Sequence, residues 1–257
     1  MELIKNLLPA MNREKLDSTR LSVEPEYDCL ICKDVGVVHP VENGKVDYSQ
    51  LVPCLCRADS IIKERQQRML KYCFLPADTE GWTLKKFEAY TDTLKKALAA
   101  ASEVAKPDGN IKWLTLIGGV ETGKSHLAVA ICREWLKHDI PARYVGVPTM
   151  LDELRATYDK DAEDSFLSKM HFYQNVPLLV LDDLGVEKLT DWGYEKLYSI
   201  INSRLENGFP LVVTTNVDIS AIPGDKEHRI GSRLLRHKQG KVITMGVKDY
   251  SVHKGRR

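Results

Sequence analysis

The sequence has no long stretch without charge. Its longest run free of Asp, Glu, Lys and Arg is the twelve residues 170–181, in a chain of 257 residues, whereas a membrane-spanning helix needs roughly 20 apolar residues. The first residues do not match a signal peptide, because Lys5 interrupts their short apolar run and no small-residue cleavage site follows. We therefore expect a cytoplasmic protein with no membrane-spanning segment.

Cysteine is also scarce, with six residues in the chain. In a cytoplasmic protein these cysteines argue against a disulfide framework. Four of them form two close pairs, Cys29-x2-Cys32 and Cys54-x-Cys56. Four thiolates in two pairs fit tetrahedral zinc, and a structural metal would compensate for the small apolar core of this segment. His39 as a replacement ligand and an iron–sulfur cluster are the alternatives.

Net charge is almost absent as well, at +1. This value hides a division along the chain, because residues 1–225 hold 27 Lys and Arg against 34 Asp and Glu, whereas residues 226–257 hold 10 against 2. An acidic body with a basic end suggests an anionic partner, so the near-neutral total does not exclude nucleic acid. The basic end is either a solvated segment or a phosphate-binding one.

The first part of the chain differs in composition from the rest. Between the two cysteine pairs, the turn signal Asn43-Gly44 predicts a short hairpin. A polar helix is expected from about residue 59 to residue 72. We place a zinc-binding, partner-interaction module at residues 1–75 and a second domain at residues 76–257.

From about residue 91 onward, expected helices alternate with apolar strands. This alternation predicts an α/β fold with a five-stranded parallel sheet. The expected strands are 113–117, 142–147, 177–181, 210–215 and 241–245. The expected helices are 92–105, 124–138, 149–170 and 192–206. Because few residues follow the last strand, we expect no C-terminal helical lid.

The segment after the first of these strands, GGVETGKS, matches the phosphate-loop pattern G-x-x-x-x-G-K-[ST]. Its glycines let backbone N–H groups face the phosphates of ATP at a helix N-terminus, where Lys124 adds positive charge and Ser125 is a ligand of Mg²⁺. The residues expected to contact ATP are Gly118, Gly119, Val120, Glu121, Thr122, Gly123, Lys124, Ser125 and His126.

Two further strand ends carry polar residues. The apolar strand LLVL is followed by Asp182 and Asp183, and the next strand is followed by Asn216. Ligands bind at the carboxyl ends of parallel strands, so Asp182 is expected to hold Mg²⁺ through its water shell and Asp183 to orient the attacking water. Asn216 is expected to hold that water or the γ-phosphate. Asp183 as a helix cap or surface acid, and Asn216 as a turn residue, are the alternatives.

The order of these motifs along the chain is typical of a known protein family. GGVETGKSHLA, LLVLDDLG, YEKLYSIINSRLENGFPLVVTTN and RIGSRLLR together resemble the DnaC/DnaI helicase loaders and the related IstB transposition ATPases of the AAA+ superfamily. The resemblance implies that Asp182 and Asp183 are Walker B acids and that Asn216 is the sensor 1 residue. It also implies that the cysteine module is a zinc-bearing domain that contacts the helicase.

The resemblance further implies an oligomer. The R-I-x-S-R pattern at residues 229–233 matches the segment that supplies an arginine finger to a neighbouring subunit's nucleotide. A guanidinium placed there neutralises charge that develops on the γ-phosphoryl group. We expect Arg233 to be this finger, with Arg229 and Arg236 as the alternatives.

The expected function is that of an ATP-dependent helicase loader in DNA replication. Such a protein would bind and slowly hydrolyse ATP as a homo-oligomer with Mg²⁺, and would place a replicative DNA helicase on single-stranded DNA. One alternative is an IstB-like ATPase that regulates transposition on duplex DNA. Another is a nucleotide-gated scaffold without useful turnover.

Overall fold

The computed structural model describes residues 27–42, 44–159, 165–186 and 188–246. Contacts divide the chain into two compact units, Met1–Ile61 and Ile62–Arg257, which are described separately. The end of the basic segment, residues 247–257, lies outside the described residues. None of the helices in the described part of the chain is both long and apolar enough to span a bilayer.

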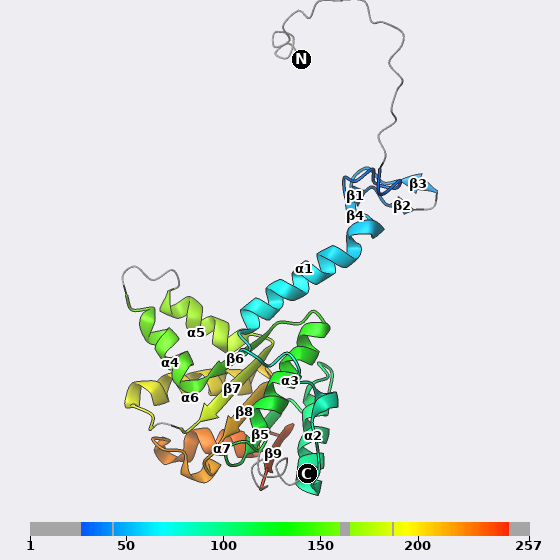
Figure 1. Cartoon of the computed structure of the whole chain (residues 1–257). Helices are drawn as coiled ribbons and strands as arrows, with labels where there is room; N and C mark the ends of the chain where they lie inside the picture. The colour runs from blue at the N-terminus through cyan, green and yellow to red at the C-terminus, as the bar shows by residue number, and fades with distance from the viewer. Residues whose placement is uncertain (1–26, 43, 160–164, 187, 247–257) are drawn as a thin grey trace, which may run out of the picture. The chain divides into compact units, whose positions relative to one another are not determined.

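The smaller unit is built from four short strands and the beginning of a helix (Figure 1). Strand β1 pairs with β4, and β2 pairs with β3, both antiparallel. The β2–β3 pair is the predicted hairpin, and Gly44 takes a φ of 77° in its turn, which glycine adopts without strain. These elements are β1 (Val37–Val38), β2 (Val41–Glu42), β3 (Lys45–Val46), β4 (Val52–Pro53) and α1 (Leu55–Cys73).

Helix α1 crosses the division between the two units, which falls after Ile61 and not after the predicted residue 75. The reason is apolar packing at the end of the helix. Cys73 is fully buried in the core of the larger unit, and Met69 and Leu75 pack against the same core. Residues 62–75 therefore belong to the larger unit.

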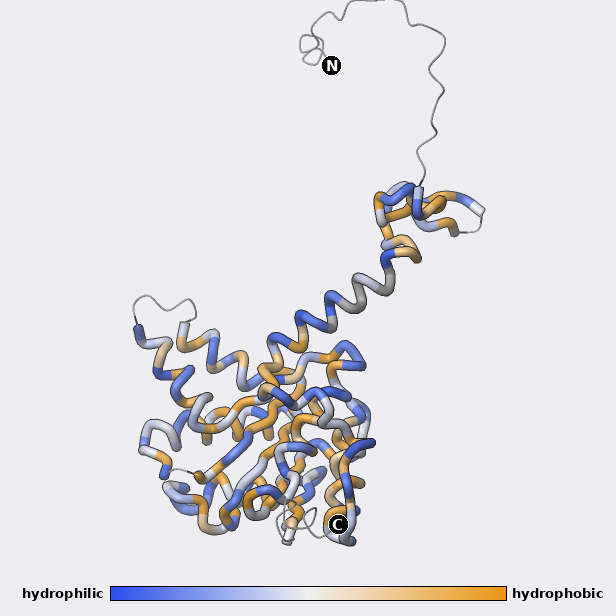
Figure 2. The backbone as a smooth tube through the Cα atoms, in the orientation of Figure 1, coloured by the Kyte–Doolittle hydropathy of each residue, from blue (hydrophilic) through white to orange (hydrophobic). Residues whose placement is uncertain are grey.

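The larger unit contains a five-stranded parallel sheet in the order β6-β7-β8-β5-β9, which confirms the predicted α/β class. Its strands are mostly apolar (Figure 2), as expected of a parallel sheet that is covered on both faces. The strands are β5 (Trp113–Ile117), β6 (Ala142–Gly146), β7 (Leu178–Leu184), β8 (Leu211–Thr215) and β9 (Gly240–Thr244).

Helices cover both faces of this sheet, and alternation along the strands divides the apolar residues between them. Leu114 and Val180 belong to the core under α2 and α3, whereas Trp113 and Leu181 belong to the core under α4 to α7. The helices are α2 (Asp92–Val104), α3 (Lys124–Lys137), α4 (Val147–Ala156), α5 (Phe166–Asn175), α6 (Asp191–Asn207) and α7 (Arg229–Arg236). Two separate helices, α4 and α5, replace the single helical region predicted over 149–170.

Candidate nucleotide-binding site and cysteine cluster

The phosphate loop joins β5 to α3 at the carboxyl edge of the sheet. The N–H of Gly118 donates to the carbonyl of Thr215 at 3.1 Å, which attaches the start of the loop to β8. Thr122 donates its hydroxyl to the carbonyl of Gly119 at 3.1 Å and closes the loop on itself. Gly123 takes a φ of 92° immediately before α3, a conformation that favours glycine. The loop therefore has the curled backbone that a phosphate cradle requires.

Lys124 and Ser125 form the first turn of α3. Lys124 is buried, and its Nζ donates to the carbonyl of Gly119 across the loop at 2.6 Å. Burial lowers the pKa of Lys124, whereas the nearby carboxylates of Asp183 and Asp182 favour its charged form. The ammonium group is thus held at the loop itself, where phosphates would bind.

The carboxylate of Asp182 lies next to the hydroxyl of Ser125, as the motifs predict. Ser125 Oγ donates to the two carboxylate oxygens at 3.1 and 3.3 Å. Tyr144 of β6 and Thr214 of β8 also donate their hydroxyls to Asp182. A hydroxyl and a buried carboxylate side by side at a phosphate loop are hard oxygen donors, so these residues fit Mg²⁺ bound largely through water.

Asp183 lies in a bulge of β7. The pairing of β7 with β8 shifts between Leu181 and Leu184, and Asp183 takes a φ of 57° there. This conformation separates the exposed Asp183 side chain from the buried Asp182 side chain. Desolvation and the negative charge of Asp182 raise the pKa of Asp183, and Lys124 opposes this shift. Asp183 is not a helix cap, because β7 continues through it to Leu184.

Thr214 makes the contact with Asp182 from β8, and Asn216 does not take part in it. Asn216 is exposed directly after the end of β8, at the same edge of the sheet. Sequence reasoning missed Thr214 and Tyr144. A polar residue inside an apolar strand was the available signal for Thr214. The reach of Tyr144 depends on β6 lying beside β7, which the sequence does not state.

A cavity of about 630 Å³ lies beside the phosphate loop. Its second wall is the segment before α2, which supplies Trp82, Phe87 and Tyr90. His126 stacks on Trp82 with the ring centroids 5.4 Å apart, and its Nε2 lies 3.1 Å from the carbonyl oxygen of Thr83. Burial lowers the pKa of His126, so its ring is neutral at pH 7. Aromatic side chains on this wall suit the binding of a flat, partly apolar group such as a nucleobase.

The guanidinium of Arg233 makes all three of its hydrogen bonds to α6 and α7. Its Nε donates to Asn202 Oδ1 at 2.8 Å, its Nη2 to the hydroxyl of Tyr198 at 2.5 Å, and its Nη1 to the carbonyl of Arg229 at 3.1 Å. The side chain of Arg229 is more exposed and pairs with Glu227 at 3.1 Å. Both arginines thus lie on α7, and the side chain of Arg233 has more hydrogen-bond partners within the chain than the side chain of Arg229.

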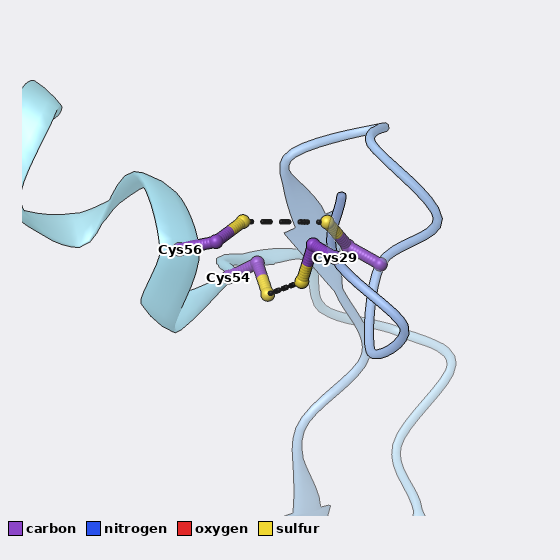
Figure 3. A group of neighbouring side chains, drawn as sticks. Cys29, Cys54 and Cys56 are labelled. Carbon is purple, nitrogen blue, oxygen red and sulfur yellow. Dashed lines mark hydrogen bonds between the residues drawn. The ribbon is translucent and has the colours of Figure 1, made fainter. Parts of the chain in front are cut away.

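The four predicted cysteine ligands come together in the smaller unit (Figure 3). Cys29 Sγ lies 3.7 Å from Cys54 Sγ, Cys32 Sγ lies 3.5 Å from Cys56 Sγ, and all four sulfurs lie within 4.8 Å of one another. Zinc–sulfur bonds of roughly 2.3 Å in a tetrahedron place sulfurs about 3.8 Å apart. The cluster therefore fits zinc.

Two thiols of this cluster differ in their proton affinity. Backbone N–H groups of Cys32 and Ile31 lower the pKa of Cys29 to about 7, which favours the thiolate that a metal requires, whereas hydrogen bonds with Cys32 and Cys29 raise the pKa of Cys56 to about 12. His39 directs its Nδ1 to the carbonyl of Gln50 at 2.6 Å and is not a member of the cluster. The arrangement therefore favours the four cysteines over His39 as the ligand set.

Comparisons of sequence relate the chain to known ATP-binding proteins. The family described as IstB-like ATP binding protein matches residues 40–225. The replicative helicase loader DnaI of Bacillus subtilis is 24% identical over 243 residues, which cover 83% of this chain and 74% of that protein. The replicative helicase loader DnaC of Escherichia coli K12 is 29% identical over 151 residues, which cover 57% of this chain and 58% of that protein.

Comparisons of structure agree on the fold. A crystal structure of the DnaC helicase loader has a TM-score of 0.56 at 24% identity and covers 66% of this chain and 99% of that one. The replication initiator DnaA bound to AMPPCP and single-stranded DNA has a TM-score of 0.59 at 19% identity, covering 68% and 52%. The larger unit therefore has the α/β fold of the AAA+ domains of DnaC and DnaA.

The position of Lys124 predicts its role in nucleotide binding. Lys124→Ala is expected to weaken ATP binding on the order of 100-fold, about 3 kcal/mol, because it removes a charge-assisted contact inside the loop. Calorimetric titration with ATP measures the effect. Lys137→Ala, an exposed lysine at the other end of the same helix, is the control and should bind ATP normally. Retained affinity in Lys124→Ala would exclude this loop as the ATP site.

The cysteine cluster predicts about one zinc ion per chain. Elemental analysis of the purified protein should find this zinc, and Cys54→Ser should lose it. Cys132→Ser, which replaces another buried cysteine outside the cluster, should keep it. Iron with acid-labile sulfide, found in place of zinc, would contradict the zinc assignment and support the iron–sulfur alternative.

Proposed function

We propose, from the premise that this chain belongs to the family of IstB-like ATP binding proteins, that it is an ATP-dependent helicase loader. It binds and hydrolyses ATP as a homo-oligomer and helps to place a replicative DNA helicase on single-stranded DNA. The observation that carries this proposal is the combination of an ATP site and a metal-binding module in one chain. The match to DnaI covers 83% of the chain, which is more than the larger unit contains, so it extends into that module.

The residues of the larger unit can carry ATP hydrolysis. Mg²⁺, when bound, would neutralise charge on the phosphates next to Ser125 and Asp182. Lys124, whose Nζ contacts the carbonyl of Gly119 in the loop, adds a second positive charge. Asp183, exposed beside Asp182, can accept a hydrogen bond from the attacking water and orient it. Because the cation that completes such sites comes from a neighbouring subunit, turnover by the isolated chain is expected to be slow.

The surface of the smaller unit supports a role in partner binding. Leu30 and Ile31, between the first two cysteines, are 83% and 68% exposed, and Leu55, between the last two, is 81% exposed. Large apolar side chains gathered on so small a unit favour a protein interface. The cysteine cluster holds these three residues in place because each lies between two of its ligands. We infer that this surface binds the helicase.

Substitutions on this surface of the smaller unit test the loader function. Leu30→Asn combined with Ile31→Asn should weaken binding to the purified replicative helicase of the same organism at least about tenfold, because burying a Leu or Ile side chain contributes about 1.5–3 kcal/mol. ATP binding should stay unchanged. Leu167→Asn, which removes a 78% exposed leucine of α5, is the matched control and should bind the helicase normally.

Helicase capture by the double variant at the level of the wild-type protein would remove the assigned surface. No helicase binding at all, combined with ATP-dependent assembly on duplex DNA, would overturn the loader function and favour the IstB-like transposition ATPase. Strong ATP binding with no hydrolysis in the presence of helicase and DNA would favour the scaffold.

Assembly is tested through Arg233. Arg233→Ala should lower ATP hydrolysis on the order of 10³-fold, as loss of an arginine finger does. Mixing it with Asp183→Asn subunits should restore part of the activity, because each variant keeps what the other lacks. Lys238→Ala, which removes an exposed cation two residues after the same helix, is the control and should hydrolyse ATP normally. Rescue by Arg229→Ala mixtures, with no effect of Arg233→Ala, would assign the finger to Arg229.

A further inference from the structure

Asp182 is held from both sides by hydroxyl groups of neighbouring strands. Strand β7 lies between β6 and β8 in the sheet. Tyr144 of β6 donates to one oxygen of the carboxylate and Thr214 of β8 donates to the other. Tyr144, Thr214 and Asp182 are all buried. The two oxygens thus have different donors, and the carboxylate plane has one preferred orientation.

Strand register produces this arrangement. Val180 pairs with Tyr144 on one side and with Val212 on the other. All three side chains lie in the core under α3, the face on which the phosphate loop ends. Two residues further along their strands, Asp182 and Thr214 point to the same face, since side chains alternate with a period of two. The long side chain of Tyr144 covers the remaining distance to Asp182.

The chemistry of the donors indicates what they do. Ser125, Tyr144 and Thr214 are neutral hydroxyls, so they orient the carboxylate without neutralising it. Its negative charge stays available for a cation. Ser125 belongs to the phosphate loop and is needed at the metal, whereas Tyr144 and Thr214 come from neighbouring strands and hydrogen-bond to Asp182. Thr214 also accepts a hydrogen bond from the backbone N–H of Asp183 at 3.1 Å.

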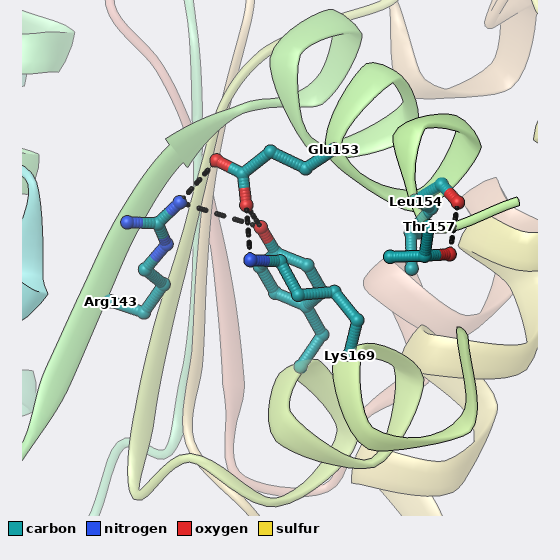
Figure 4. A network of polar contacts seen from close by, with 6 residues as sticks. Arg143, Glu153, Leu154, Thr157 and Lys169 are labelled. Carbon is teal, nitrogen blue, oxygen red and sulfur yellow. Dashed lines mark hydrogen bonds and ion pairs between the residues drawn. The ribbon is translucent and has the colours of Figure 1, made fainter. Parts of the chain in front are cut away.

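A second carboxylate of this protein shows the opposite arrangement. Glu153 accepts a hydrogen bond from the buried phenol of Tyr173 and also pairs with Arg143 at 2.5 Å and Lys169 at 3.3 Å (Figure 4). Two cations satisfy its charge, as expected of a structural ion cluster that joins β6, α4 and α5. Of these two tyrosine–carboxylate contacts in the described part of the chain, the one at Asp182 is made with neutral hydroxyls, whereas Glu153 also pairs with two cations.

We propose that Tyr144 and Thr214 are positioning residues that orient Asp182 toward the water shell of nucleotide-bound Mg²⁺. This inference rests on the proposed function, since it requires that the loop binds Mg²⁺ and ATP. Residues that hydrogen-bond to a metal ligand without touching the metal typically contribute 10–100-fold to metal affinity or activity. For Thr214, the sequence signal for such a role is a polar residue inside the apolar strand β8.

The test uses the full chain and a fluorescent ATP analogue whose binding is titrated with Mg²⁺. Tyr144→Phe and Thr214→Val should each need about 10–100-fold more Mg²⁺ for half of the metal-dependent gain in nucleotide affinity. Affinity measured in EDTA should stay within about twofold of the wild-type value, because the loop itself is unchanged. Tyr173→Phe, which removes the equivalent hydroxyl at Glu153, is the matched control and should titrate as the wild-type protein does.

Thr214→Ser retains the hydroxyl and should need no more Mg²⁺ than the wild-type protein, unlike Thr214→Val. This comparison separates the positioning role of the hydroxyl from the packing of the side chain. An unchanged Mg²⁺ requirement in Tyr144→Phe and Thr214→Val would overturn the inference alone. Equal loss of affinity with and without Mg²⁺ would also overturn it, because the effect would then be structural. Absence of nucleotide binding by the wild-type chain would overturn the proposed function, and this inference with it.

Discussion

The parallel pairing of β7 with β6 and β8 is the constraint on which the larger unit depends. In-register parallel strands bring their carboxyl ends to one edge of the sheet, and the phosphate loop, Asp182 and Asn216 all lie at that edge. The phosphate loop is itself fastened there through the bond from Gly118 to Thr215. A slip of one residue in β7 would turn Asp182 to the other face of the sheet, away from Ser125. Burial of apolar residues on both faces prevents such a slip.

Much of this architecture follows from local sequence patterns. The apolar runs predict all five strands, and the loop motif places Lys124 and Ser125 correctly beside Asp182. The cysteine spacing predicts the four members of the cluster. These features succeed because each is encoded within a short segment, either by side-chain alternation or by a motif with a fixed geometry.

The features that were missed depend on contacts between segments far apart in the chain. Tyr144 reaches Asp182 only because β6 lies next to β7, and Trp82 faces the loop only because the segment before α2 packs against α3. The two compact units divide after Ile61 and the predicted domain boundary is at residue 75, because Cys73 ends a helix that looks polar in sequence but packs in the core of the larger unit. The extension of β7 to Leu184 results from the bulge at Asp183, which no periodicity reveals.

Under the proposed function, in which Arg233 acts on a neighbour's nucleotide, its hydrogen bonds have a consequence for the timing of hydrolysis. A guanidinium that already donates to Asn202, Tyr198 and Arg229 must exchange these partners before it can serve a neighbour. The resting contacts then oppose premature turnover in a solitary or misaligned subunit. Only an interface that offers a stronger acceptor, such as the terminal phosphate of a bound nucleotide, can draw the side chain away. Under the proposed function, the same three bonds therefore set a threshold that lets ATP persist until assembly is complete.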